Sequence, residues 1–119
     1  MTGLMVSDDL IFTSRVTATA GAHGLTVTTA KTAEAAIRSA AASPPSCVIV
    51  DLQNPGLDLP VFLAGLRDVC PIMPRVIGYG SHMAVDVLKA ARQAGCDRVM
   101  PRSQFAEELE VGLKEWLTG

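Results

Sequence analysis

The sequence has few residues of the kinds that build metal centres or disulfide frameworks. Its three cysteines, Cys47, Cys70 and Cys96, lie far apart and form no Cys-x-x-Cys pair, and the 119 residues include only two histidines. This spacing offers no zinc ligands. An odd number of cysteines favours a reducing compartment, where a free cysteine packs as a small apolar residue. We therefore expect a cytoplasmic protein without disulfides.

The sequence also lacks the features that bring a protein to membranes or nucleic acids. We expect no signal peptide from the start MTGLMVSDDL, and no apolar run approaches the roughly 20 residues that cross a bilayer. Ten basic against twelve acidic residues give a formal net charge of −2. The basic residues are scattered, so no surface is expected to attract nucleic acid or an anionic membrane.

The sequence does contain an alternation of short apolar runs with stretches of helical periodicity. A hydrophobic content of 49% suits a single domain, 1–119, with one core. Five runs have the length and composition of strands: 3–7, 25–29, 47–51, 75–79 and 97–100. Apolar residues at helical spacing follow each run, and the clearest set is Phe105, Leu109 and Leu113.

Residues at the segment boundaries agree with this alternation. Thr32 and Ser103 can cap helix N-termini, and Pro60 fits a first helical turn. Gly24 and Gly95 lie where helices would end. Five successive strand–helix units predict an α/β fold, a doubly wound five-stranded parallel sheet with five helices covering both faces. Strands covered on both faces need not alternate apolar and polar residues, and these runs do not.

Acidic residues follow two of the predicted strands. Asp51 ends the run CVIVD, and Asp8 and Asp9 directly follow the first run. Ligands of a doubly wound sheet bind outside the carboxyl ends of its strands. If the first and third strands are neighbours, the three carboxylates converge, and a hard cation such as Mg²⁺ would relieve their repulsion. Asp51 could then act as a nucleophile toward a phosphoryl group.

The chain resembles the response-regulator receiver domain in the order of these features. The resemblance covers nearly the whole length of the chain. The resemblance is carried by VSDDL, VIVDLQNPGLD and AARQAGCDRVM. It implies a flavodoxin-like three-layer sandwich that works in two-component signal transduction or a phosphorelay and is not an enzyme. It also implies that a histidine kinase or phosphotransfer protein phosphorylates Asp51 to an aspartyl phosphate. The backbone carbonyl of Gln53 would then face the Mg²⁺, which Asp8, Asp9 and Asp51 would also bind.

Three positions depart from the family pattern. The pair of adjacent acids at the first strand falls on Ser7 and Asp8 by the usual spacing, or on Asp8 and Asp9 after a shift of one residue. The hydroxyl that contacts the phosphoryl group falls on Gly80, with Ser81 one residue later.

The third departure concerns the end of the fifth strand. The family's lysine is replaced by Arg102, whose broad planar fork differs from a compact ammonium group, and Pro101 precedes it. Val99 occupies the place of an aromatic residue that often moves in the family's switch, while Tyr79 on the fourth strand is aromatic. The acceptor is kept and the groups that sense its phosphorylation are changed.

Two functions are therefore compatible with the sequence. One is a receiver that is phosphorylated on Asp51 and acts on an output protein through contacts beside the fourth and fifth strands. The alternative is an atypical pseudo-receiver that binds partners independently of phosphorylation. Simpler roles also stay open, since Asp9 and Ser81 can cap helices and Arg102 can be solvated. A dehalogenase-type enzyme is disfavoured because it needs a second aspartate where Gln53 stands.

Overall fold

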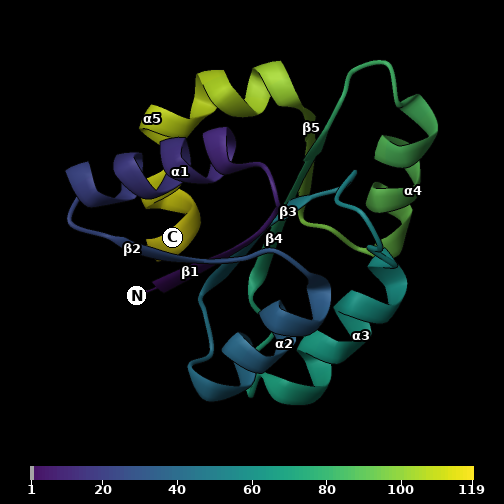
Figure 1. Cartoon of the computed structure of the whole chain (residues 1–119), viewed down its shortest axis with the longest axis horizontal. Helices are drawn as coiled ribbons and strands as arrows, with labels where there is room; N and C mark the ends of the chain where they lie inside the picture. The colour runs from purple at the N-terminus through teal and green to yellow at the C-terminus, as the bar shows by residue number, and fades with distance from the viewer. Residues whose placement is uncertain (1) are drawn as a thin grey trace.

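The computed structural model describes residues 2–119, in which strands and helices alternate along the chain (Figure 1). The strands are β1 (Thr2–Val6), β2 (Thr26–Ala30), β3 (Cys47–Asp51), β4 (Arg75–Gly80) and β5 (Arg98–Pro101). The helices are α1 (Leu10–Ala22), α2 (Ala33–Ala42), α3 (Leu59–Val69), α4 (Val85–Ala94) and α5 (Arg102–Thr118). All strand pairs are parallel, in the order β2-β1-β3-β4-β5. The predicted doubly wound sheet is confirmed, and β1 and β3 are neighbours.

Two helical layers cover the sheet (Figure 1). Helices α1 and α5 pack on one face, which we call the α1/α5 face, and α2, α3 and α4 pack on the other. Along β3 the side chains alternate between these layers, with Cys47 and Ile49 in the α1/α5 core and Val48 and Val50 in the opposite core. Because successive strand residues point to opposite faces, Asp51 follows Ile49 onto the α1/α5 face.

The helix boundaries follow from local chemistry, with one exception to the predictions. The Thr32 side chain accepts a hydrogen bond from the Ala35 amide at 3.1 Å and so caps α2, and Pro60 lies in the first turn of α3. Gly95 ends α4 with φ 110, a left-handed conformation that glycine adopts without strain. The predicted cap at Ser103 is wrong, because α5 already begins at Arg102 after Pro101, whose ring fixes a helix-compatible φ of −59.

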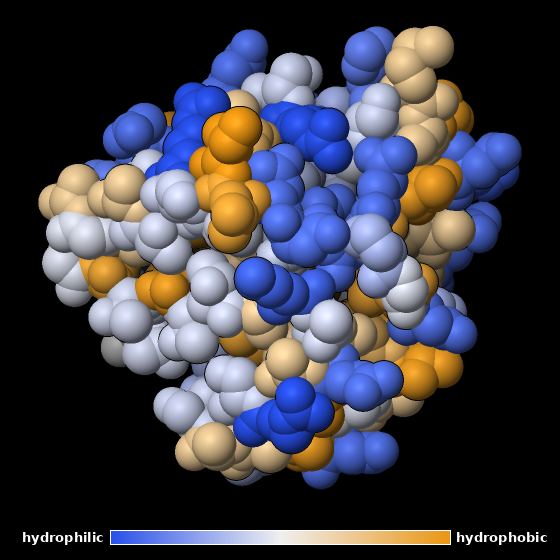
Figure 2. All heavy atoms as spheres, in the orientation of Figure 1, coloured by the Kyte–Doolittle hydropathy of each residue, from blue (hydrophilic) through white to orange (hydrophobic). Residues whose placement is uncertain are grey.

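The surface mixes polar and apolar residues. On the face that Figure 2 shows, apolar side chains form separate small groups between polar ones. None of the helices within residues 2–119 is both long enough and apolar enough to cross a membrane.

Candidate functional site at the carboxyl end of the sheet

Asp51 lies at the end of the central strand with both carboxylate oxygens hydrogen-bonded. The residue is 6% exposed. The Ser7 hydroxyl donates to Oδ2 at 2.9 Å, and the backbone amide of Gln53 donates to Oδ1 at 3.0 Å. Buried polar groups are stabilised by such hydrogen bonds. The structure therefore holds this side chain in a fixed orientation at the crevice where ligands of this fold bind.

Ser7 is the residue from the first strand that contacts Asp51. It is 2% exposed, and its hydroxyl also accepts a hydrogen bond from the Asp9 amide at 3.1 Å. The register of the sheet explains this position. Val6 pairs with Val50, so the next residue of each strand, Ser7 and Asp51, lie side by side. Of the alternatives left open by the sequence, Ser7 rather than Asp9 lies next to Asp51.

The other two acids are held differently. The Asp9 carboxylate caps α1, because its Oδ1 accepts from the amides of Ile11 at 3.0 Å and Phe12 at 3.1 Å. Asp8 is exposed, and its backbone amide donates to Asn54 Oδ1 at 2.9 Å. Within residues 2–119 no group of three or more histidine, cysteine, aspartate or glutamate side chains is arranged to hold a metal ion. The expected convergence of all three carboxylates is therefore not found.

The loop after β3 ties the neighbouring strand ends to the site. Gln53 Oε1 accepts from the Ser81 amide at 2.7 Å, which links this loop to the end of β4. Asn54 is 5% exposed and donates through Nδ2 to the Lys31 carbonyl at 2.9 Å. Through these hydrogen bonds Asn54, which follows β3, connects the segments after β1 and β2. The sequence alone did not predict this role. The only signal was an asparagine before Pro-Gly, a combination typical of turns.

The two positions predicted for the phosphate-contacting hydroxyl have other surroundings. Gly80 ends β4 on the opposite side of the sheet from Asp51, since a Cβ there would lie 3.5 Å from Leu88 Cδ2. The Ser81 hydroxyl accepts from the Met83 amide at 3.1 Å and so stabilises the turn before α4. Neither residue donates a hydrogen bond to Asp51 in this structure.

Arg102 stands near the site without an ion pair to it. Its guanidinium carbon lies 5.9 Å from the centroid of the Phe12 ring, a cation–π arrangement. Together with Ser81 and His82 it borders an open hollow of about 390 Å³. Over residues 2–119 the one salt bridge joins Arg98 to Glu108 at 2.9 Å, on the exposed side of β5 and α5. The structure thus places the positive charge beside the crevice, on the α1/α5 face.

Tyr79 forms the floor of the site beneath Asp51. It pairs with Asp51 in the register of β3 and β4 and is fully buried. Its ring stacks on Phe105 with a centroid separation of 4.6 Å and lies 5.1 Å from the Phe12 ring. Burial, and then the nearby Asp51 carboxylate, raise the pKa of the Tyr79 phenol above its usual range. A neutral hydroxyl therefore lies next to the anionic side chain.

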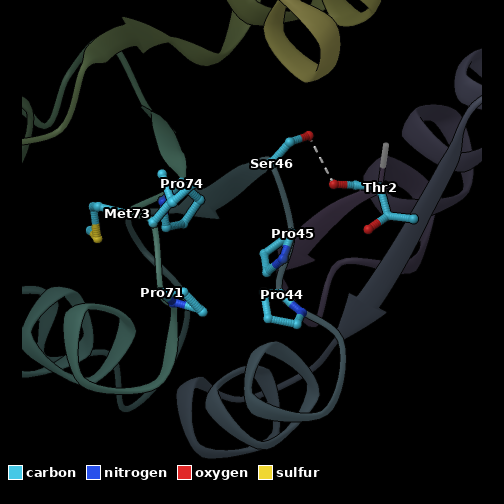
Figure 3. Close-up of a pocket in the computed structure, with 8 residues that line it drawn as sticks. Thr2, Pro44, Pro45, Ser46, Pro71, Met73 and Pro74 are labelled. Carbon is cyan, nitrogen blue, oxygen red and sulfur yellow. Dashed lines mark hydrogen bonds between the residues drawn. The ribbon is translucent and has the colours of Figure 1, made fainter.

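A second hollow opens at the opposite end of the sheet, away from Asp51. It measures about 570 Å³, and Pro44 and Pro45 line it from the loop before β3 while Pro71 and Pro74 line it from the loop before β4 (Figure 3). The Ser46 hydroxyl donates to the backbone carbonyl of Thr2 at 3.1 Å. No titratable side chain is among its lining residues within 2–119. It offers apolar surface but no group for acid–base or phosphoryl chemistry.

Comparison with solved structures identifies the fold. The receiver domain of NtrX from Brucella abortus superimposes with a TM-score of 0.81 at 21% identity, covering 98% of this chain and 99% of that one. A response regulator receiver domain protein from Clostridium thermocellum gives a TM-score of 0.78 at 19% identity, covering 98% and 93%. A longer NtrX structure also matches with a TM-score of 0.81 at 20% identity, over 27% of its own chain. No protein-family model and no curated protein sequence matches this chain. The chain has the receiver fold, as the sequence resemblance implied.

Proposed function

We propose that this chain is a two-component signalling module in which Asp51 accepts a phosphoryl group from a phosphohistidine of a histidine kinase or phosphotransfer protein. The observation that carries the proposal is the placement of Asp51, at the carboxyl end of the central strand, with both oxygens oriented by Ser7 and Gln53. The receiver fold of the whole chain supports the same assignment.

The transfer uses groups that are present in the site. One Asp51 oxygen attacks phosphorus, the phosphorus–nitrogen bond breaks, and its electron pair returns to the imidazole nitrogen of the donor. The Ser7 hydroxyl would have to release Oδ2, or Oδ1 would act as the nucleophile. The Gln53 amide, which donates to Asp51 Oδ1, supports the proposal because it keeps the nucleophilic carboxylate oriented.

A divalent cation would be bound by three of the four ligands that the sequence resemblance implied. Mg²⁺ is usually bound by one or two carboxylates and keeps several waters. Asp51 and the exposed Asp8 supply two carboxylates, and the Gln53 carbonyl is a third oxygen, whereas the Asp9 carboxylate already caps α1. The bound ion would neutralise charge on the phosphoryl oxygens. We therefore propose Asp8, Asp51 and Gln53 as the Mg²⁺ ligands.

Exposed apolar residues flank the crevice and favour protein partners. Leu10 and Ile11, directly after the acidic segment, are 68% and 82% exposed, and Met83 after β4 is 78% exposed. Large apolar side chains in such positions are typical of protein contacts. The kinase or phosphotransfer protein would approach Asp51 over this rim, and an output protein would read the change that follows.

Beryllofluoride, which imitates a phosphoryl group on aspartate, tests the proposal in the presence of millimolar Mg²⁺. We expect amide NMR signals of Ser7, Gln53 and Ser81 to shift in the wild type and to stay unchanged in Asp51→Asn, which loses the nucleophilic carboxylate. Asp58→Asn is the matched control, because Asp58 caps α3 and asparagine caps equally well. Wild-type signals that do not respond would contradict phosphorylation of Asp51.

A second candidate function is protein binding that does not depend on phosphorylation. The Ser7–Asp51 hydrogen bond favours it, because a hydroxyl stands where an acidic metal ligand was expected and already engages Oδ2. The absence of a beryllofluoride response would support this candidate. An interaction partner would then bind wild type and Asp51→Asn with equal affinity.

A further inference from the structure

The Tyr79 hydroxyl is a buried polar group without a satisfactory partner. Among residues 2–119 it is the one fully buried side-chain nitrogen or oxygen with no hydrogen bond of acceptable geometry. An unpaired buried hydroxyl lowers the stability of a protein, and native structures contain few of them. When such a group lies at a functional site, it requires an explanation.

The surroundings of this hydroxyl are those of the proposed phosphorylation site. Asp51 and Asp9 raise the pKa of the phenol, after the larger effect of burial, while Ser7 and Arg102 act in the opposite direction. Tyr79 pairs with Asp51 across β3 and β4, and the Ser7 hydroxyl donates to the same carboxylate at 2.9 Å. The Phe12 ring lies 5.1 Å from the Tyr79 ring, and the Arg102 guanidinium carbon lies 5.9 Å from the Phe12 centroid. The raised pKa keeps the phenol protonated and able to donate.

The ring cannot turn the hydroxyl toward solvent. Tyr79 is 0% exposed, and its ring is held between Phe105 and Phe12 at centroid distances of 4.6 and 5.1 Å. An oxyanion attached to Asp51 would supply the acceptor that the hydroxyl lacks. Ser81 was a candidate phosphate contact by resemblance to the receiver family. Its hydroxyl instead accepts a hydrogen bond from the Met83 amide in the turn before α4.

We propose that the Tyr79 hydroxyl donates a hydrogen bond to an oxyanion attached to Asp51 and is the group by which this site senses its modification. The inference rests on the proposed function, since the oxyanion is the phosphoryl group. It assigns the sensing role to Tyr79, whose ring lies in the α1/α5 core, rather than to the Ser81 hydroxyl after β4. Phe105 in turn stacks on Trp116 at 5.6 Å, so a continuous series of ring contacts connects Tyr79 with the C-terminal part of α5.

The Tyr79→Phe variant separates sensing from packing, because it removes only the hydroxyl. Without beryllofluoride we expect the melting temperature to rise by about 3 °C, since an unpaired buried donor is lost. With Mg²⁺ and beryllofluoride we expect about tenfold weaker apparent affinity, the effect of losing one hydrogen bond to a charged acceptor. A purely structural hydroxyl would change both quantities in the same direction.

Each alternative result has its own meaning. Unchanged affinity in Tyr79→Phe, together with loss of binding in Asp51→Asn, would overturn the sensing role and leave the proposed function intact. A lower melting temperature would show that the hydroxyl already bonds Ser7 in the resting state, which also overturns the inference. A wild type that does not bind beryllofluoride would overturn the proposed function and the inference with it.

A fluorine label gives a measurement that needs no substitution in the core. Tyr79 is the single tyrosine of the chain, so 3-fluorotyrosine labels this position alone. We expect the ¹⁹F signal to shift on addition of Mg²⁺ and beryllofluoride to the wild type, and to stay in place in Asp51→Asn. A ¹⁹F signal that stays in place while the Gln53 amide shifts would overturn the sensing role.

Discussion

The two faces of the sheet are packed with different kinds of side chains. Four of the five aromatic residues, Phe12, Tyr79, Phe105 and Trp116, lie on the α1/α5 face, and only Phe62 lies on the other, which is filled by aliphatic side chains and alanines. Stacked rings have few alternative arrangements, whereas aliphatic side chains adapt to small changes. Since Asp51 points to the aromatic face, a change at its carboxylate would act first on the core that is built from stacked rings.

Removing one ring from each face is the strongest test of this difference. Phe105→Ala and Phe62→Ala should each lower the free energy of unfolding by about 3–5 kcal/mol, because both side chains are almost completely buried. Urea denaturation measures this cost. Only Phe105→Ala removes the ring stacked on Tyr79, so it alone should reduce the amide shifts that beryllofluoride causes at Gln53.

The matched pair also shows how the comparison could fail. If Phe62→Ala weakens the beryllofluoride response as much as Phe105→Ala does, the response depends on overall stability and not on the aromatic face. The beryllofluoride responses are compared in dilute buffer at a temperature at which the NMR spectra of both variants show folded protein.

Two helical glycines allow a milder test of the same idea. A Cβ at Gly112 would lie 2.8 Å from the Trp116 indole on the aromatic face, and a Cβ at Gly65 would lie 2.9 Å from the Ile37 Cδ1 methyl on the other. The indole is held by its stacking on Phe105, so the clash in Gly112→Ala should cost about 1–3 kcal/mol and offset the roughly 1 kcal/mol that the helix propensity of alanine contributes. The Ile37 methyl can move, and the higher helix propensity of alanine, about 1 kcal/mol, should make Gly65→Ala nearly neutral.

Thermal unfolding and the fluorescence of the single tryptophan report the result. Gly112→Ala should shift the emission of Trp116, while Gly65→Ala should leave it unchanged. Equal melting temperatures for the two variants would mean that the aromatic face accommodates an added methyl group as easily as the aliphatic face.

Much of the fold could be predicted from the sequence because it depends on local patterns. The run CVIVD occupies β3 with the predicted bounds, Thr32 caps the start of α2, and Gly95 ends α4, as their chemistry indicates. The parallel direction of the strands followed from the alternation of strands and helices, whereas their order in the sheet was not predicted. Ser103 failed as a cap because the helix begins two residues earlier, with Pro101 at the capping position, a competition that residue preferences alone do not resolve.

The site was less predictable because it depends on single-residue register and on side-chain direction. Whether Ser7 or Asp9 meets Asp51 is decided by the pairing of Val6 with Val50, which the spacing of acids does not specify. Arg102 carries the expected charge, but its long side chain lies over Phe12. The placement of Tyr79 opposite Asp51 needs the register of two strands that are far apart in sequence.

The cysteines offer the smallest test, through the pH dependence of stability on each face. Burial raises the pKa of Cys47, on the α1/α5 face, to about 12 and that of Cys96, on the other, to about 11, from an ordinary 9.0. Both thiols stay neutral in the folded protein while the unfolded chain ionises, so their contribution is fully present below pH 9 and is lost as pH rises through the folded pKa. Stability should therefore fall above pH 9.

Alanine variants separate the two thiols. The stability difference between wild type and Cys96→Ala should shrink between pH 9 and about 11 and then level off, whereas the difference for Cys47→Ala should keep shrinking to about pH 12. Urea denaturation of the three proteins across this range measures both differences. Identical profiles would mean that the thiols are equally shielded from water. Because Cys47 is completely buried in the aromatic core while Cys96 is partly exposed, we expect the tighter core to hold its thiol neutral to the higher pH.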